Sequence, residues 1–76
     1  MSDSCTYLDL IEFTCPWPII KTKQKMQDLS KGEQLLVVVK DPSFYIDCNV
    51  YLGNSGDKLI KHWEKNSCFY YLLQKK

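Results

Sequence analysis

The feature that most constrains this chain is a Cys-Pro-Trp-Pro motif at residues 15–18, where an alternating strand-like pattern stops and a helical pattern begins. Proline has no backbone N–H, so it is tolerated in the first turn of a helix, where the N–H groups have no intrahelical acceptor. Pro16 and Pro18 therefore predict a helix start, with Pro16 at its first position. Cys15 then lies at or next to the N-cap, near the positive end of the helix dipole.

Cys15 has two interpretations at that position. A thiol at a helix N-terminus tends to ionise, which makes it a candidate nucleophile. The alternative is a small buried hydrophobe, which is the role of most intracellular cysteines. Serine, threonine, aspartate or asparagine would serve better as a purely structural cap. The motif therefore favours a reactive Cys15, with a structural Cys15 in a non-catalytic interaction or regulatory module as the alternative.

Length and composition predict a single domain over residues 1–76. A chain of 76 residues supports one small core, and an apolar fraction of 45% with 25% charged residues is ordinary for a folded protein. The net charge of +1 gives little attraction to nucleic acid or anionic membranes. The longest apolar run, 35–39, is too short to span a bilayer, and Met1 to Ser4 lack a signal pattern, so we expect a soluble, cytoplasmic protein with reduced cysteines.

The order of the expected elements is strand, helix, strand, helix, strand, strand. The first strand covers residues 7–10, and Gly32 marks the turn after the first helix. Asp41-Pro42 repeats the pattern of a cap followed by a first-turn proline and opens the second helix. The remaining strands are expected at 33–40, 58–64 and 68–74. Burying one apolar stripe per helix predicts an α+β fold, a two-layer α/β sandwich of βαβαββ order, with a four-stranded mixed sheet and both helices on one face.

These residues resemble the TusA/SirA-like proteins, small sulfur carriers built around a Cys-Pro-x-Pro motif. The resemblance covers nearly the whole chain and includes Leu8-Asp9 before the motif, Gly32-Glu33 before the second strand, and Asp41-Pro42 after it. Two positions depart from the pattern. Glu12 stands where many relatives have glycine, and Gly56-Asp57 stands where relatives often have Gly-His.

The resemblance implies that Cys15 accepts sulfane sulfur as a persulfide and hands it to a partner protein, in tRNA thiolation, molybdenum-cofactor assembly or thiosulfate-related trafficking. Such exchange needs a thiolate and access, but no metal or other cofactor. It is sulfurtransferase chemistry, without a classical hydrolase or oxidoreductase site. The implied partners are a cysteine desulfurase or other persulfide donor, an acceptor protein and a membrane sulfur-compound transporter. We expect a monomer without direct nucleic-acid binding.

Other functional assignments have weaker support. Zinc binding requires closely spaced ligands, whereas the four cysteines are widely separated and His62 is the one histidine. A Cys15/His62 dyad would need the two side chains within hydrogen-bond reach. The expected partner-binding patch surrounds Cys15 and consists of Pro16, Trp17, Pro18, Lys21, Asp41 and Pro42. Within it, capping explains Asp41 without a partner, and the lysines at 21, 23 and 25 also fit an ordinary solvated face.

Overall fold

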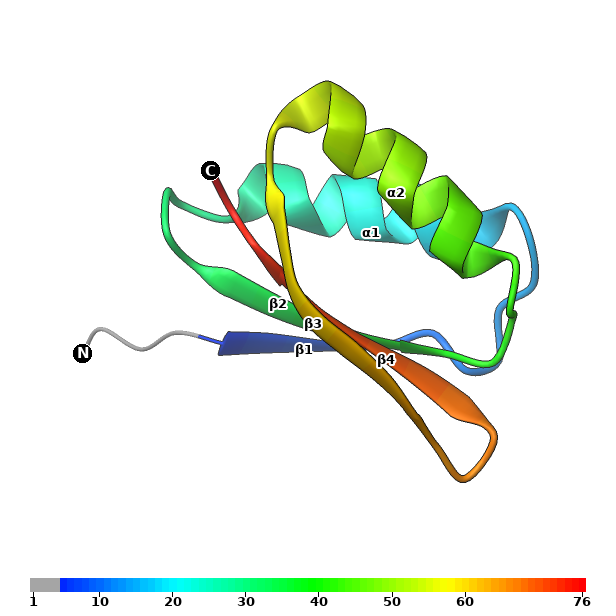
Figure 1. Ribbon diagram of the computed structural model, residues 1–76. Coiled ribbons are helices and arrows are strands. Elements are labelled where there is room, and N and C mark those ends of the chain that lie inside the picture. Colours follow the sequence, from blue (N-terminus) through cyan, green and yellow to red (C-terminus); the bar gives the residue numbers. More distant parts are fainter. Residues whose placement is uncertain (1–4) are drawn as a thin grey trace.

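The computed structural model describes residues 5–76 and contains six elements in the predicted order. They are the strands β1 (Cys5–Asp9), β2 (Gln34–Val39), β3 (Lys58–Lys65) and β4 (Cys68–Gln74), and the helices α1 (Trp17–Asp28) and α2 (Phe44–Ser55). The expectation about Met1 to Ser4 lies outside the described residues. Both helices cover the same face of the sheet, so the predicted α+β sandwich is confirmed (Figure 1).

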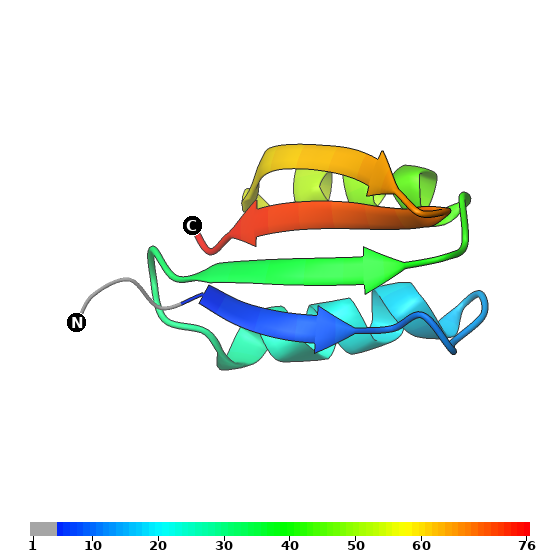
Figure 2. The same ribbon diagram turned by 90° about the horizontal axis from the view of Figure 1, so that it is seen from below.

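The sheet has the order β1-β2-β4-β3 and is mixed. β1 pairs with β2 in parallel, with Thr6 opposite Leu35, while β4 pairs antiparallel with both β2 and β3. The arrows of β1 and β2 therefore point the same way, and the chain leaves both strands at one edge (Figure 2). Consecutive positive φ angles at Asn66 and Ser67 close the β3–β4 hairpin, as a two-residue turn of the primed type requires.

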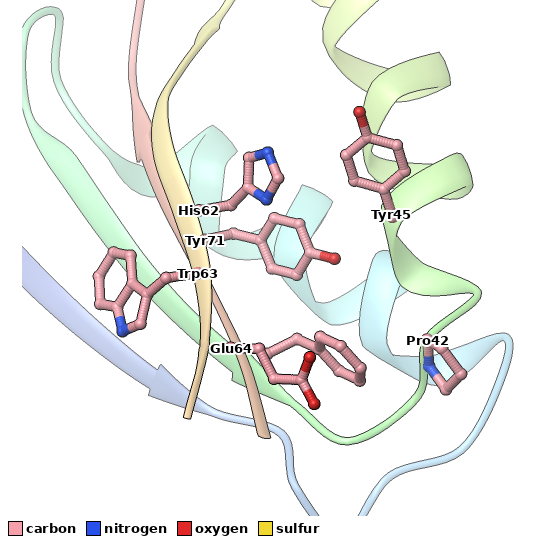
Figure 3. A pocket seen from close by; sticks show the side chains of 7 residues that line it. Pro42, Tyr45, His62, Trp63, Glu64 and Tyr71 are labelled. Atoms are coloured by element: carbon pink, nitrogen blue, oxygen red, sulfur yellow. The ribbon is translucent and has the colours of Figure 1, made fainter. Parts of the chain in front are cut away.

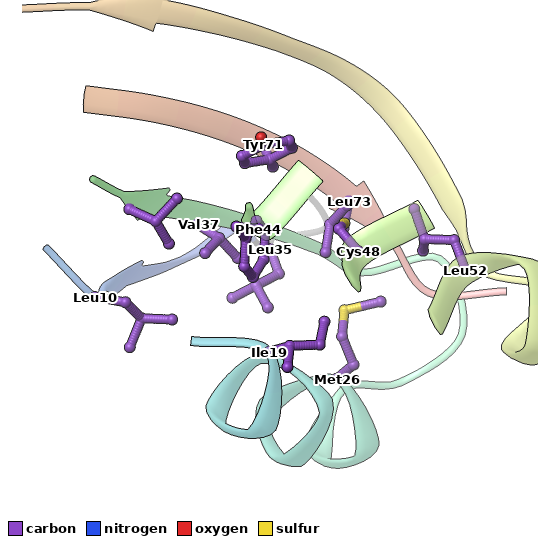
Figure 4. Packing of buried hydrophobic residues seen from close by; sticks show 11 residues of the cluster. Leu10, Ile19, Met26, Leu35, Val37, Phe44, Cys48, Leu52, Tyr71 and Leu73 are labelled. Atoms are coloured by element: carbon purple, nitrogen blue, oxygen red, sulfur yellow. The ribbon is translucent and has the colours of Figure 1, made fainter. Parts of the chain in front are cut away.

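The core lies between the sheet and the helices (Figure 4). The stripe of α1 that faces the sheet contributes Ile19, Thr22 and Met26, all buried. Thr22 satisfies its hydroxyl inside the core by donating to the Pro18 carbonyl at 2.8 Å. The stripe of α2, the inner positions of the central strands and Leu10, which follows β1, complete the cluster: Leu10, Phe44, Cys48, Leu52, Leu35, Val37, Val39, Tyr71 and Leu73. Apolar residues at helical and strand periods thus meet in one layer, as the patterns predict.

Both helix starts differ in detail from the prediction. The N-cap of α1 is Pro16, so Pro16 lies one residue before its expected position and Pro18 occupies the second helical position. Pro18 is still in the first turn, where a missing N–H costs nothing. The N-cap of α2 is Ser43 rather than Asp41. The Asp41 side chain instead closes a turn in front of the helix, accepting from the Ser43 N–H at 2.9 Å and from the Ser43 hydroxyl at 2.8 Å.

The ends of the helices follow different rules. α2 continues through Gly53 to Ser55 and ends at Gly56, whose φ of 82° gives the left-handed cap typical of glycine. Gly32 also has a positive φ, 88°, but it serves the turn into β2, since α1 ends earlier with an extended cap at Leu29. Neither helix of the described chain is long and apolar enough to cross a membrane.

Candidate functional site

A tight turn between β1 and α1 delivers the chain to Cys15. The Ile11 N–H donates to the Asp9 carboxylate at 3.0 Å, and the Phe13 N–H donates to the Leu10 carbonyl at 3.1 Å. Glu12 lies in this turn without a positive φ. The glycine common among relatives is therefore not needed here, because the Asp9 side chain and the Leu10 carbonyl close the turn in a conformation open to any residue.

Cys15 lies directly before the N-cap of α1, and its side chain is exposed. The Cys15–Pro16 peptide bond is cis, and the Trp17 N–H donates to the Thr14 carbonyl at 2.9 Å, which folds Thr14 to Trp17 into a turn. No side-chain hydrogen bond caps α1. The thiol is therefore next to a helix start, as predicted, and it is neither packed in the core nor used as a cap.

Cys15 lies at a groove between the two helices. The groove has a volume of about 540 Å³, and its lining comes from the start of α1 and from one side of α2: Cys15, Pro16, Ile19, Lys23, Asp47, Val50, Tyr51 and Asn54. Lys23 extends its ammonium over the Tyr51 ring, 5.9 Å from the centroid. Val50 is 61% exposed although it is apolar. The thiol thus faces an open surface that combines one cation, one carboxylate and exposed apolar side chains.

The Asp41-Pro42 corner lies near the Cys15 backbone, at the edge of the sheet where the parallel strands β1 and β2 both end. Hydrogen bonds from the Ser43 backbone and hydroxyl lower the pKa of the Asp41 carboxyl, and the backbone N–H of Cys15 adds to the same shift. The hydrogen bonds of the Asp41 carboxylate are those with Ser43, in the turn before α2, and the Cys15 backbone lies close enough to affect its pKa.

The expected partner-binding patch is only partly assembled around the thiol. Trp17 is 52% exposed on the first turn of α1, where its indole is available to a partner. Lys21 is half-buried, with its ammonium 4.9 Å from the centroid of the Phe13 ring, and it does not line the thiol groove. Pro18 is buried under the helix start. Lys23, rather than Lys21, is the lysine of the groove.

The other three cysteines occupy different environments. Cys48 is buried in the core, and burial raises the pKa of its thiol to about 12. Cys68 is half-buried on β4, and Cys5 is exposed at the start of β1. All four cysteines are free. Among them, only Cys15 combines exposure with a helix start and a groove.

His62 lies away from the thiol groove. It belongs to a different groove, between α2 and the β3–β4 hairpin, so the fold does not bring the Cys15/His62 pair into one site. Within residues 5–76, no three histidine, cysteine or acidic side chains are grouped so that they could hold a metal ion.

Sequence reasoning missed the contribution of α2 to the site. Val50, Tyr51 and Asn54 line the thiol groove, and the local sequence of Tyr51 and Asn54 does not distinguish them from other positions of an amphipathic helix. Val50 could have been found, because Ile46 and Val50 are apolar residues four positions apart that lie off the core stripe. Such an exposed apolar pair on a helix marks a surface that a partner can cover.

Comparison with known proteins gives a consistent family. A family model described as Sulfurtransferase TusA matches residues 6–75. The sulfur carrier protein TusA of Allochromatium vinosum is 29% identical over 75 residues, 99% of each chain. The sulfur carrier protein TusA of Pseudomonas syringae pv. syringae is 32% identical over 69 residues, which is 91% of this chain and 82% of the relative. The protein of the same name from Buchnera aphidicola subsp. Baizongia pistaciae is 31% identical over 68 residues, which is 90% of this chain and 86% of the relative.

Proposed function

This chain belongs to the TusA family of sulfur carrier proteins, and we propose that it carries sulfane sulfur as a persulfide on Cys15. The observation that carries the proposal is the position of Cys15, an exposed thiol next to the start of α1 at the edge of an open groove. Access of this kind is what exchange between two large partners requires. An exposed side chain also has no packing role, which disfavours a structural Cys15.

In the loading step a thiolate attacks a persulfide, and one sulfur–sulfur bond replaces another. The Cys15 thiolate attacks the terminal sulfur of a donor persulfide, a new S–S bond forms on Cys15 Sγ, the donor S–S bond breaks, and the donor leaves as a thiolate. Unloading reverses the roles. The thiolate of an acceptor attacks the terminal sulfur of the Cys15 persulfide and releases the Cys15 thiolate. Each step consumes one thiolate and releases another, and the transferred sulfur keeps its oxidation state, so no oxidant or reductant is consumed.

The groove residues would assist by charge and by shape. Lys23 places an ammonium in the groove that holds the thiol, where it favours anionic donors and the anionic persulfide. Val50 and the half-buried Tyr51 offer apolar surface beside it. Membership of the family implies a donor protein and an acceptor protein. We propose a cysteine desulfurase or other persulfide donor, and tRNA thiolation, molybdenum-cofactor assembly or thiosulfate-related trafficking as the destination.

Intact-mass measurement after incubation with glutathione persulfide tests the proposal. We expect a gain of about 32 Da, one sulfur atom, that peptide mapping places on Cys15 and that dithiothreitol removes as sulfide. A variant that retains Cys15 but carries Cys5→Ser, Cys48→Ala and Cys68→Ser should load equally well. An adduct found mainly on another cysteine, or no adduct, would contradict the assignment of Cys15.

A further inference from the structure

A second groove lies between the start of α2 and the β3–β4 hairpin, and it contains none of the residues that line the thiol groove. Its volume is about 460 Å³, within the range of small-ligand sites. Figure 3 shows its lining, which is mostly aromatic: Pro42, Tyr45, His62, Trp63, Glu64, Phe69 and Tyr71. We call it the aromatic groove.

The rings of the aromatic groove are held in place by one another. The His62 and Tyr71 rings stack with centroids 5.8 Å apart and planes inclined by 15°, and Tyr45 meets His62 at 5.4 Å. Tyr71 is anchored from the core by Phe44, at 4.9 Å. In Figure 3 the Tyr71 hydroxyl points toward the space below α2. Burial raises the pKa of Tyr71 to about 12, so this hydroxyl stays protonated near neutral pH.

Glu64 carries the one full charge among the seven lining residues when His62 is neutral. Its side chain lies on the same side of β3 as His62, at the end of the groove toward Pro42, whereas the Trp63 indole lies on the opposite face (Figure 3). The aromatic groove therefore combines negatively polarised ring faces with a carboxylate and contains no cation of its own.

We propose that the aromatic groove binds the guanidinium group of an arginine side chain presented by a protein partner. A cation over an aromatic face is attracted by the ring quadrupole. The flat guanidinium stacks on rings and offers a fork of N–H donors that fits a carboxylate, whereas the lysine ammonium is a compact and strongly hydrated charge. A neutral segment in the same place would cover Glu64 without pairing it, which costs desolvation energy.

The aromatic groove adjoins the thiol site through one corner of the chain. Pro42 lines the groove, and the preceding Asp41 lies close enough to the backbone N–H of Cys15 for that group to help lower its pKa. A partner that reaches Cys15 can therefore reach the groove with a neighbouring arginine. This use in docking rests on the proposed sulfur-carrier function, but guanidinium binding itself does not, so the two can fail separately.

The test is an NMR titration of the full chain with an acetylated, amidated Gly-Arg-Gly tripeptide. We expect saturable shifts at the backbone amides of His62 and Glu64 and at the Tyr45 ring. The peptide with citrulline in place of arginine has nearly the same shape without the charge, and it should bind at least about fivefold more weakly. The lysine peptide should bind more weakly than the arginine peptide.

Two substitutions and a control locate the site. Glu64→Gln removes the charge at constant shape, and Tyr45→Leu removes one ring from an exposed position; each should raise the Kd about three- to fivefold. Asp47→Asn is the control. Asp47 lies on α2, as Tyr45 does, but its carboxylate lines the thiol groove, so this substitution should leave the Kd unchanged. Equal binding of the citrulline peptide, shifts centred elsewhere, or a Kd unaffected by Glu64→Gln would overturn the proposal.

Discussion

Asp41 and Cys15 lie close together at the two helix starts, and the backbone N–H of Cys15 adds to the hydrogen bonds from Ser43 that lower the pKa of the Asp41 carboxyl. This proximity follows from the parallel pairing of β1 with β2, which sends both helix starts to one edge of the sheet (Figures 1 and 2). Residues of this region line both the thiol groove and the aromatic groove. Cys15 lines one of them and Pro42 lines the other.

Cys15→Ser should abolish sulfur loading and leave the fold intact. The side chain is exposed and caps nothing, so the substitution removes no packing and no hydrogen bond of the helix start. We expect a change in Tm of no more than about 4 °C, because most surface substitutions change stability by no more than about 0.5 kcal/mol, together with complete loss of the persulfide adduct. Thermal unfolding and intact-mass measurement on the same sample check both parts, and a large drop in Tm would instead indicate a structural cysteine.

Trp17→Ala should weaken docking of a functional donor or acceptor by more than about 1 kcal/mol, because an exposed indole on the first turn of α1 is suited to anchor a partner. The rate of Cys15 with a small thiol reagent should stay the same. Tyr7→Ala is the matched control, since Tyr7 is 55% exposed and lines neither the thiol groove nor the aromatic groove. Unchanged affinity for Trp17→Ala would place the interface elsewhere.

Lys23→Ala should slow the loading of Cys15 by glutathione persulfide about two- to threefold at low ionic strength, because it removes the cation of the thiol groove. The difference should shrink as salt is added, since the interaction is screened. Lys25→Ala removes an equal charge from the same helix outside the groove and should load at the normal rate. Equal slowing by both substitutions would show that only net charge matters.

Asp41→Ala should destabilise the chain by about 1 kcal/mol, since the N–H and hydroxyl of Ser43 lose their acceptor. Hydrogen bonds from Ser43 hold the pKa of Asp41 below 3.8. The carboxylate therefore stabilises the fold fully above the pKa that Asp41 has in the unfolded chain. This stabilisation is lost as the pH falls through the lower pKa that Asp41 has in the folded chain. Acid unfolding followed by circular dichroism should be shallower for Asp41→Ala. Asp41→Asn retains an acceptor oxygen and should be intermediate in stability, and a cost equal to that of alanine would contradict this account.

Cys48 should make the chain sensitive to alkali. Burial raises the pKa of its thiol from 9.0 to about 12, so between these values the unfolded chain releases a proton that the folded chain keeps. The contribution of this thiol to the free energy of unfolding is complete below pH 9 and falls by up to about 1.4 kcal/mol per pH unit above it. Urea denaturation at several pH values measures the slope. Cys48→Ala should flatten it, and an unchanged slope would exclude Cys48 as a cause.

The sequence predicted most of the fold, for reasons visible in particular residues. The apolar run from Leu35 to Val39 forms the centre of the sheet, and Ile19 and Met26 on one helical stripe are buried beneath α1. The helix starts were less exact, because prolines and an aspartate restrict the first turn without specifying which residue becomes the cap. Turn geometry decided that Pro16 and Ser43 are the N-caps, and that Asp41 bonds to Ser43 before the helix begins.

The local sequence by itself determined that Cys15 precedes a helix start, because a cysteine followed by two prolines before an amphipathic repeat has few other conformations available. Only the tertiary structure decided what surrounds that thiol. Lys23, Val50 and Tyr51 share its groove because α1 and α2 pack side by side on one face of the sheet. Asp41 lies near the Cys15 backbone because β1 and β2 run parallel. Such neighbours depend on the packing of distant segments, which no periodicity within one segment encodes.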